Sequence, residues 1–255
     1  MSSLPKTALV TGAAKRIGEC LALDLAAQGF AVVVHYHQSE VEAQAVVAAI
    51  RRNGGQAEAI QADVGIESQV LALADAAARA FGPIGLLVNN ASIFERDEAL
   101  TATRESWDAH MEINLRAPFV LTQAIAAALP KEADGLVVNL LDQRIWALTP
   151  HFTSYTVSKV GLWALTQTLA LALAPRIRVN AIGPGPTLPS PRQDPAQFKR
   201  QFESMPLGHG TSPDEIAAAL RFLIAAPSMT GQMIALDGGQ HLGWSLPPRD
   251  TPPED

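Results

Sequence analysis

The chain alternates repeatedly between short apolar segments and longer segments whose apolar residues recur at helical spacing. The short segments are rich in branched aliphatic residues. They lack the apolar–polar alternation of half-exposed strands, which is typical of strands buried on both faces of a sheet. Such strands are expected over residues 7–10, 31–34, 57–61, 84–88, 135–140, 177–182 and 232–236.

The intervening segments predict helices, several of which end at Gly or Pro, as helices commonly do. We expect helices over residues 16–28, 40–52, 67–81, 106–129, 154–173 and 213–225, with a short one over 197–204. This alternation predicts an α/β fold: a doubly wound, Rossmann-type parallel sheet of about seven strands with helices on both faces.

One domain is expected over residues 1–245, followed by a proline-rich, charged and disordered tail over 246–255. The 19 basic and 25 acidic residues give a net charge of −6, so the sequence lacks the excess of positive charge that is typical of nucleic-acid-binding proteins. No apolar run approaches the roughly 18 residues that a membrane span needs. The single cysteine and the absence of a signal-like N-terminal segment predict a cytoplasmic protein.

A glycine-containing turn, TGAAKRIG, follows the first predicted strand and opens the first helix. Doubly wound sheets bind ligands at the carboxyl ends of their strands, where backbone N–H groups and a helix N-terminus favour a pyrophosphate. The G-x-G-x-x-G pattern does not fit, since only Gly12 and Gly18 stand at useful places. We therefore predict a dinucleotide site here, with an ordinary tight turn as the alternative.

The end of the second strand reads HYHQS and has no acid before Glu40. An acid at this position favours NAD, and its absence removes the repulsion that a 2′-phosphate would meet. Arg16, His37 and Ser39 can donate hydrogen bonds to that phosphate. NADPH is therefore the predicted cofactor, with a simple polar loop as the alternative.

Asp63 closes the third predicted strand. Its carboxylate could accept a hydrogen bond from an adenine amino group. A cap for the following helix is the other interpretation of this residue.

Tyr155 and Lys159 stand four residues apart on a predicted helix, so their side chains share one face. A neighbouring ammonium favours the phenolate, so we expect Lys159 to lower the pKa of Tyr155 and make it a usable proton donor near neutral pH. A pair of surface residues is the alternative interpretation.

These motifs, together with Asn89-Asn90-Ala91, Asn114 and Pro184-Gly185, occur in an order that resembles the short-chain dehydrogenase/reductase family over nearly the whole chain. The resemblance implies hydride transfer from a nicotinamide, with Tyr155 as the acid, Lys159 on the nicotinamide ribose and Asn114 holding a water of the proton relay. It also implies cofactor contacts from Gly12, Arg16, Ile17, Gly18, His37, Gln38, Ser39, Asp63, Asn90, Ala91, Lys159, Pro184 and Gly185.

Two departures narrow the resemblance. The family usually has a serine thirteen residues before the tyrosine, where this chain has Asp142, and a glycine where Arg16 stands. Both departures, with the HYHxS and NNASxF segments, resemble pteridine reductases and dihydromonapterin reductases. Gln38 differs from the arginine that often stands there and holds the 2′-phosphate.

The substitutions fit reduction of a flat pterin-type ring, which needs hydride at carbon and a proton at the adjacent nitrogen. Asp142 and Tyr155 can serve that proton delivery, although an ionised Asp142 raises the pKa of Tyr155 and opposes Lys159. Phe94 can stack on the ring, and Ser92 and Arg16 can hydrogen-bond its polar atoms. A loop cap at Asp142 and plain core at Phe94 are the alternatives.

The leading prediction is an NADPH-dependent reductase of pterin-type rings, with residues 183–205 covering the substrate. A carbonyl reductase of 3-oxoacyl thioesters or other ketones is the second hypothesis, and an inactive NADPH-binding sensor is the third. The family resemblance implies a homotetramer built on the helices over 106–129 and 154–173. No metal is predicted, because no metal-ligand spacing occurs among His110, His151, His209 and His241.

Overall fold

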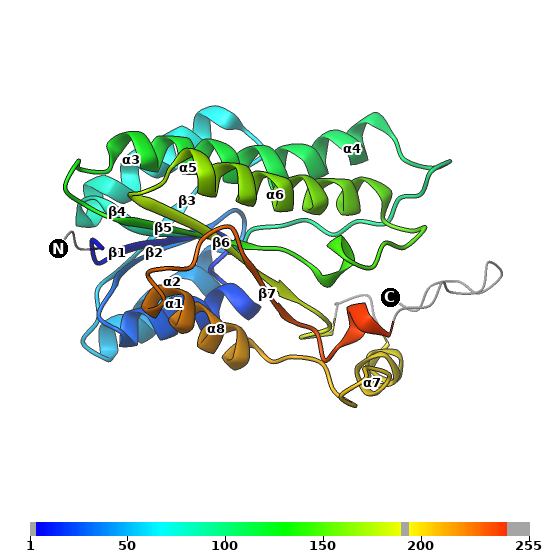
Figure 1. The fold of residues 1–255 in the computed structure, drawn as a ribbon. Coiled ribbons are helices and arrows are strands. Elements are labelled where there is room, and N and C mark those ends of the chain that lie inside the picture. The colour runs from blue at the N-terminus through cyan, green and yellow to red at the C-terminus, as the bar shows by residue number, and fades with distance from the viewer. Residues whose placement is uncertain (1–3, 190–193, 244–255) are drawn as a thin grey trace.

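A parallel sheet forms the centre of the molecule, in the strand order β3-β2-β1-β4-β5-β6-β7 (Figure 1). In this computed structural model residues 4–189 and 194–243 are described, so the tail predicted over 246–255 lies outside the described residues. The strands are β1 (Thr7–Val10), β2 (Ala31–Tyr36), β3 (Ala57–Gln61), β4 (Ile84–Asn89), β5 (Gly135–Leu140), β6 (Ile177–Pro184) and β7 (Met233–Leu236).

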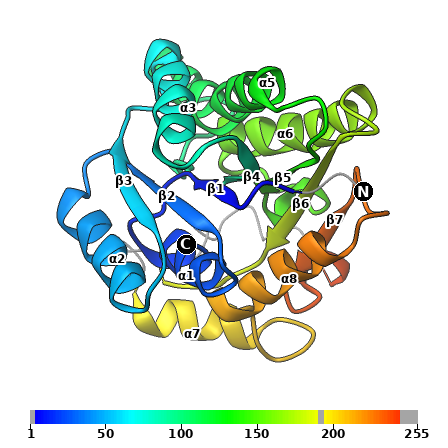
Figure 2. The ribbon, with the colours of Figure 1, turned by 90° about the vertical axis from the view of Figure 1, so that its left-hand side faces the viewer.

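Two helical layers cover the sheet. The helices are α1 (Arg16–Ala27), α2 (Glu40–Arg52), α3 (Glu67–Phe81), α4 (Arg104–Met111), α5 (Ala117–Ala128), α6 (Thr153–Ala172), α7 (Pro195–Glu203) and α8 (Pro213–Ala225). Helices α1, α2 and α8 lie on one face of the sheet, and α3, α5 and α6 lie on the other (Figure 2). The predicted doubly wound Rossmann-type fold is confirmed.

The buried strands divide their side chains between two cores. Ala8 and Val10 of β1 pack toward α1 and α8, whereas Leu9 between them packs toward α3 and α5. Successive side chains of a strand point to opposite faces, so a strand covered on both faces must be apolar at every position. This requirement is the physical reason for the continuous apolar runs in the sequence.

The helix predicted over 106–129 is present as a continuous helical backbone, but a π-helical turn divides it. Helix α4 ends at Met111, a π-helical segment follows over Glu112–Arg116, and α5 begins at Ala117. The π-helical segment carries Asn114, which is buried and hydrogen-bonds the chain after β4. Helical periodicity in the sequence does not reveal such an interruption, because a π-helical turn lies inside an otherwise continuous helix.

Other boundaries shift by a few residues. The short helix predicted over 197–204 starts earlier, at Pro195, because proline is well suited to the first turn of a helix. Strand β6 continues to Pro184, two residues past its predicted end at 182 and into the segment predicted to cover the substrate. Within the part of the chain that the structure describes, no helix combines the length and apolarity needed to span a membrane.

Candidate active site

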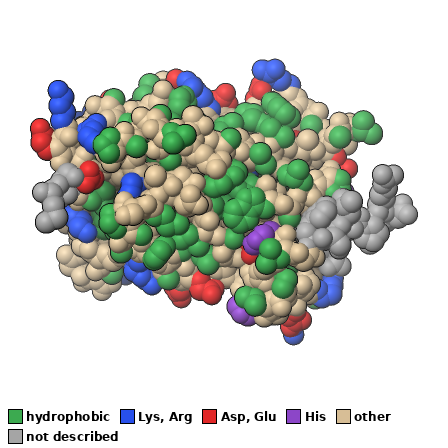
Figure 3. All heavy atoms as spheres, in the orientation of Figure 1, with side chains coloured by type: hydrophobic (Ala, Val, Ile, Leu, Met, Phe, Trp, Pro, Cys, Tyr) green, Lys and Arg blue, Asp and Glu red, His purple; other side chains and the backbone are tan. Residues whose placement is uncertain are grey.

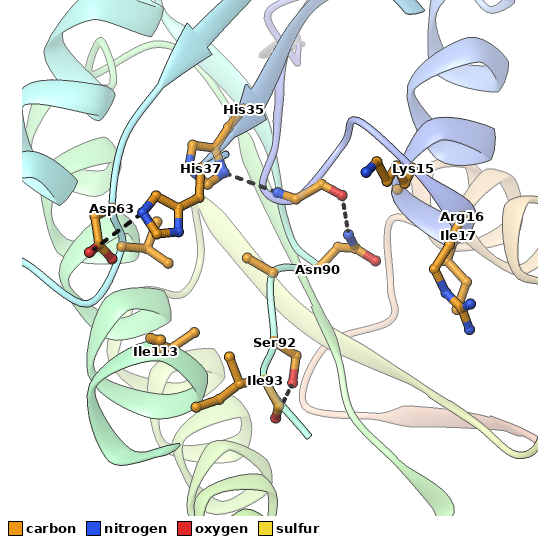
Figure 4. A pocket seen from close by; sticks show the side chains of 14 residues that line it. Lys15, Arg16, Ile17, His35, His37, Asp63, Asn90, Ser92, Ile93 and Ile113 are labelled. Atoms are coloured by element: carbon orange, nitrogen blue, oxygen red, sulfur yellow. Dashed lines mark hydrogen bonds and ion pairs between the residues drawn. The ribbon is translucent and has the colours of Figure 1, made fainter. Parts of the chain in front are cut away.

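A cavity of about 440 Å³ opens at the carboxyl ends of β1, β2 and β4 (Figure 4). The strand order reverses at this edge, between β1 and β4, which is where doubly wound sheets bind their ligands. The cavity is lined by Gly12, Lys15, Arg16, Ile17, Gly18, His35, His37, Asp63, Val64, Asn90, Ala91, Ser92, Ile93 and Ile113.

The turn after β1 is packed too closely for side chains at its two glycines. Gly12 has a φ of +62°, and a Cβ on Gly18 would lie 2.2 Å from the Gly12 carbonyl oxygen. The Asn90 amide donates to the carbonyls of Thr11 and Gly12, at 2.8 and 3.0 Å. The turn is therefore held as a fixed cradle at the start of α1.

His35 hydrogen-bonds the backbone of this cradle, a role that the sequence analysis did not predict. Its Nδ1 accepts a hydrogen bond from the Gly12 N–H at 3.0 Å, and its Nε2 lies 3.1 Å from the Ala62 carbonyl (Figure 4). Burial lowers the pKa of His35 to about 4, so the ring is neutral at physiological pH. Only the neutral ring can accept from Gly12 and donate to Ala62 at once.

Only some of the residues predicted to contact the 2′-phosphate and the adenine line the cavity. His37 and Asp63 both line the cavity, with His37 Nε2 3.7 Å from Asp63 Oδ2. Gln38 and Ser39 lie directly before α2 and are not among the residues that line the cavity. The alternative that Asp63 caps α3 is wrong, because the cap position is Ile66 and Asp63 Oδ1 accepts from the Gly65 N–H instead.

Arg16 joins the cradle to the chain that follows β6. Its guanidinium donates to the carbonyls of Leu188 and Pro189, at 3.1 and 2.8 Å. Pro184 and Gly185 lead into this segment, and Gly185 passes so close to Asp237 that a Cβ would lie 2.8 Å from its Cα. The predicted contacts of Arg16 with cofactor and substrate stay predictions.

Tyr155 and Asp142 converge at the end of β5. The Tyr155 hydroxyl donates to Asp142 Oδ2 at 2.8 Å. Asp142 Oδ1 accepts from the backbone N–H of Arg144, and the Arg144 guanidinium lies 3.2 Å from Oδ2. Asp142 therefore caps its own loop and also contacts the phenol, and its predicted part in proton delivery stays a prediction.

The charges around Tyr155 differ from the prediction. Burial and the Asp142 carboxylate raise the pKa of Tyr155 well above its usual value, against a smaller lowering by Arg144. Lys159 points past the phenol and donates to the Leu140 carbonyl at 2.8 Å. Burial lowers the pKa of Lys159 to about 8. The expectation that Lys159 lowers the pKa of Tyr155 is therefore wrong for this structure.

Phe94 forms an aromatic wall beside the phenol. Its ring stacks on Phe152 at 4.3 Å between centroids and meets Tyr155 edge-on at 4.7 Å. The Arg144 guanidinium lies 5.1 Å from the same ring. With 39% of its surface exposed, Phe94 is not plain core, so that alternative is wrong.

Asn114 fixes the chain that carries Ser92. Its Oδ1 accepts from the Ile93 N–H at 2.9 Å and from the Ser92 hydroxyl at 3.1 Å. Its amide donates to the Ile93 carbonyl and to the Ser158 hydroxyl on α6. Asn114 therefore ties the cavity wall to the helix of Tyr155, and its predicted water stays a prediction.

Two more residues of this site were missed. Arg144 follows Asp142 by two positions, and an Asp that bonds the N–H two residues on is a known turn signal that could have located the loop. Phe152 adopts a left-handed backbone, with a φ of +58°. No local sequence signal indicates that conformation for a phenylalanine.

Comparisons with known proteins agree with this geometry. A family model described as Enoyl-(Acyl carrier protein) reductase matches residues 12–241. A 3-oxoacyl-(acyl-carrier-protein) reductase from Synechocystis sp. is 36% identical, over 92% of this chain and 96% of the relative. FolM alternative dihydrofolate reductase 1 from Brucella canis, solved with NADP, is 49% identical, with a TM-score of 0.91, over 94% of this chain and 96% of that chain.

A short chain dehydrogenase from Burkholderia cenocepacia J2315, also solved with NADP, is 35% identical. Its TM-score is 0.86, and the alignment covers 92% of this chain and 98% of that chain. The family match spans nearly the whole described chain, and the sheet order and the Tyr155–Lys159 pair agree with it. The resemblance predicted from the motifs is confirmed: the chain is an oxidoreductase that belongs to the short-chain dehydrogenase/reductase family.

Proposed function

We propose that this chain is an NADPH-dependent reductase that adds hydride to a C=N bond of a pterin-type ring, as in dihydropterin, dihydromonapterin or a dihydrofolate-like compound. The observation that carries the proposal is the hydrogen bond between the Tyr155 hydroxyl and Asp142. The likeness to a FolM alternative dihydrofolate reductase solved with NADP supports it.

The residues of the cavity fit a dinucleotide phosphate. The Gly12–Gly18 cradle leaves no room for side chains, so a pyrophosphate could approach the backbone at the start of α1. His37 lines the cavity just after the end of β2. No carboxylate stands at that strand end to repel a 2′-phosphate. When bound, NADPH supplies the hydride. NADPH should therefore give a higher kcat/KM than NADH, and equal values would contradict this part of the proposal.

The protein's own residues handle the proton. The raised pKa of Tyr155 keeps its hydroxyl protonated at neutral pH, so the hydroxyl has a proton to deliver to the ring nitrogen. That proton must be replaced from solvent in the same step, because a phenolate would lie 2.8 Å from the Asp142 carboxylate. Asp142 accepts hydrogen bonds and can hold an N–H group of the substrate beside the phenol. Phe94 offers a partly exposed ring against which a flat heterocycle can stack.

Asp142 also disfavours a ketone. Hydride addition to a ketone puts negative charge on its oxygen, and Tyr155 would hold that oxygen beside the carboxylate. Two negative charges about 4 Å apart repel by about 4 kcal/mol at an effective dielectric of 20. A neutral C=N bond would develop the same charge on its nitrogen. A ring nitrogen is basic enough to be protonated before the hydride arrives, whereas a ketone oxygen is not, and the Asp142 carboxylate then faces a cation that it stabilises.

A carbonyl reductase is the second candidate, favoured by the 36% identity to a 3-oxoacyl-(acyl-carrier-protein) reductase. An inactive NADPH-binding sensor is the third, and the hydrogen bond between the buried Tyr155 and the partly buried Asp142 speaks against it. NADPH oxidation with dihydrobiopterin or dihydromonapterin, compared with an acetoacetyl thioester, separates these candidates. Turnover of the thioester alone would refute the pterin proposal. Tight NADPH binding without turnover of any substrate would favour the sensor.

We also propose a homotetramer built through α4, α5 and α6, in the cytoplasm. Hydrophobic side chains lie over the face that carries α6 in Figure 3, and Val157, Val160 and Leu171 of α6 are exposed. Their burial against further copies would remove apolar surface from water. Light scattering of the purified chain tests the number of subunits.

A further inference from the structure

Helix α6 begins without a local cap. Phe152 occupies the cap position in a left-handed conformation, and its side chain makes no capping hydrogen bond. The first N–H groups of a helix have no partner inside the helix, so they need acceptors from elsewhere. Here Asp97, more than fifty residues earlier, supplies them: its carbonyl accepts from the Thr153 N–H at 3.1 Å, and its Oδ1 accepts from the Ser154 N–H at 3.0 Å.

The other oxygen of the same carboxylate closes a chain of hydrogen bonds. The hydroxyls of Ser154 and Ser106 both donate to Asp97 Oδ2, the latter at 2.9 Å. His110 Nδ1 lies 2.7 Å from the Ser154 hydroxyl, and His110 Nε2 accepts from the Glu95 N–H at 3.2 Å. Because Nε2 accepts, the proton of the neutral ring is on Nδ1, where the Ser154 hydroxyl and the Ser106 carbonyl, at 2.9 Å, are both within hydrogen-bonding distance.

The cluster is buried. Asp97 is 3% exposed, and Ser154 and His110 are fully buried. Burial raises the pKa of the Asp97 carboxyl, but hydrogen bonds from Ser154 and Ser106 outweigh that effect and hold the pKa below its usual value. A buried carboxylate satisfied by several donors fixes their geometry strongly, because losing one leaves a buried polar group unpaired.

The cluster connects the segment that carries Phe94 to the helix that carries Tyr155. Asp97 lies three residues after Phe94, and Ser154 lies directly before Tyr155. The Phe94 ring in turn packs on Phe152 and against Tyr155. We propose that Asp97, acting through Ser154 and His110, is a positioning residue that sets the Tyr155 hydroxyl and the Phe94 ring relative to each other. This inference rests on the proposed role of Tyr155.

The test compares Ser154→Ala and Asp97→Asn in the full chain, each with a matched control. Thr156→Val removes another buried hydroxyl from the first turn of α6, one that has no hydrogen-bond partner among the described residues. Asp108→Asn removes an exposed carboxylate from α4. With NADPH and dihydrobiopterin, we expect kcat to fall roughly 10- to 100-fold in the two test variants and less than about twofold in the controls.

A double-mutant cycle separates positioning from general destabilisation. In the Tyr155→Phe background, Ser154→Ala should lower the remaining kcat by a clearly smaller factor than in the wild-type background, because only the Phe94 ring is left to position. The Kd for NADPH, followed by its fluorescence, should stay within about twofold in every variant. Should Asp97→Asn not fold, Ser154→Ala carries the same test.

Three results would overturn the inference: equal losses with and without the Tyr155 hydroxyl, a Ser154→Ala variant as active as Thr156→Val, or a weakened Kd for NADPH. The proposed function fails differently. If Tyr155→Phe alone keeps full activity, the proposed catalytic role of Tyr155 is wrong, whatever activity the Asp97 and Ser154 variants have.

Discussion

Replacing Asp142 by serine should change which substrate this enzyme prefers. The carboxylate lies 2.8 Å from the Tyr155 hydroxyl, so a ketone oxygen bound by Tyr155 would sit about 4 Å from a negative charge and meet about 4 kcal/mol of repulsion at an effective dielectric of 20. The Arg144 guanidinium contacts the same oxygen of this carboxylate, Oδ2, that accepts from Tyr155. It therefore lies at most about 7 Å from the ketone oxygen and returns at least about 2 kcal/mol.

The net penalty for a developing oxyanion is therefore at most about 2 kcal/mol, or up to roughly 30-fold in kcat/KM. We expect Asp142→Ser to raise kcat/KM for an acetoacetyl thioester by up to that factor. It should lower kcat/KM for dihydrobiopterin by about 10- to 100-fold, because the substrate loses the acceptor for its N–H group.

Asp142→Asn is the matched control for charge, since it keeps one oxygen for the Arg144 N–H and the shape of the side chain. It should raise the thioester rate nearly as much as serine does. Melting curves and the Kd for NADPH establish that each variant is folded. A ratio of pterin to thioester activity that stays constant in both variants would refute the reasoning from charge.

Three further predictions concern single residues. Tyr155→Phe should lower kcat by about 10²- to 10⁴-fold with the Kd for NADPH unchanged, as measured by stopped-flow NADPH oxidation, and a silent substitution would remove Tyr155 from catalysis. Gly18→Ala should weaken NADPH binding at least about 100-fold, because its Cβ would lie 2.2 Å from the Gly12 carbonyl; calorimetry showing wild-type affinity would contradict the cradle. His35 is neutral in the folded state with a pKa of about 4 and takes up a proton near pH 6.5 when unfolded, so stability should fall by about 3 kcal/mol as the pH drops from 6.5 to 4. Urea titrations should show this slope reduced in His35→Gln.

The fold could be predicted from sequence because its determinants are local. The apolar runs of β1 and β2 reflect burial on both faces, and the glycine turn after β1 reflects a close backbone approach. Tyr155 was also found, from its four-residue spacing to Lys159. Asp142 was found from the family resemblance, because it stands where the family usually has a serine, and the structure places it against the Tyr155 hydroxyl.

The supporting residues could not be predicted, because their partners are distant in the chain. Asp97 caps a helix that starts at residue 153, and Asn114 binds Ile93 across a π-helical segment that local periodicity does not reveal. The direction of the Tyr155 pKa shift was missed for a related reason. The distance from Lys159 to the phenol depends on whether its ammonium turns to the Leu140 carbonyl, which no spacing along one helix determines.

The order in which Tyr155 and Lys159 lose their protons leads to a final prediction. Burial lowers the pKa of Lys159 to about 8, whereas burial and Asp142 raise that of Tyr155 well above its usual value of about 10. As the pH rises, Lys159 therefore loses its charge while Tyr155 still holds its proton. Since kcat/KM reports the pKa values of the free enzyme, it should fall above about pH 8 because of Lys159 and not because of Tyr155.

The residual activity of Tyr155→Phe distinguishes the two residues. It should keep the decline near pH 8, because Lys159 is still present. Lys159→Arg, whose side chain stays charged throughout this range, should remove the decline or move it well above pH 9. If the decline instead disappears in Tyr155→Phe and persists in Lys159→Arg, the phenol is the group that titrates. The raised pKa of Tyr155, and with it the view of this residue as a protonated donor held by Asp142, would then be wrong.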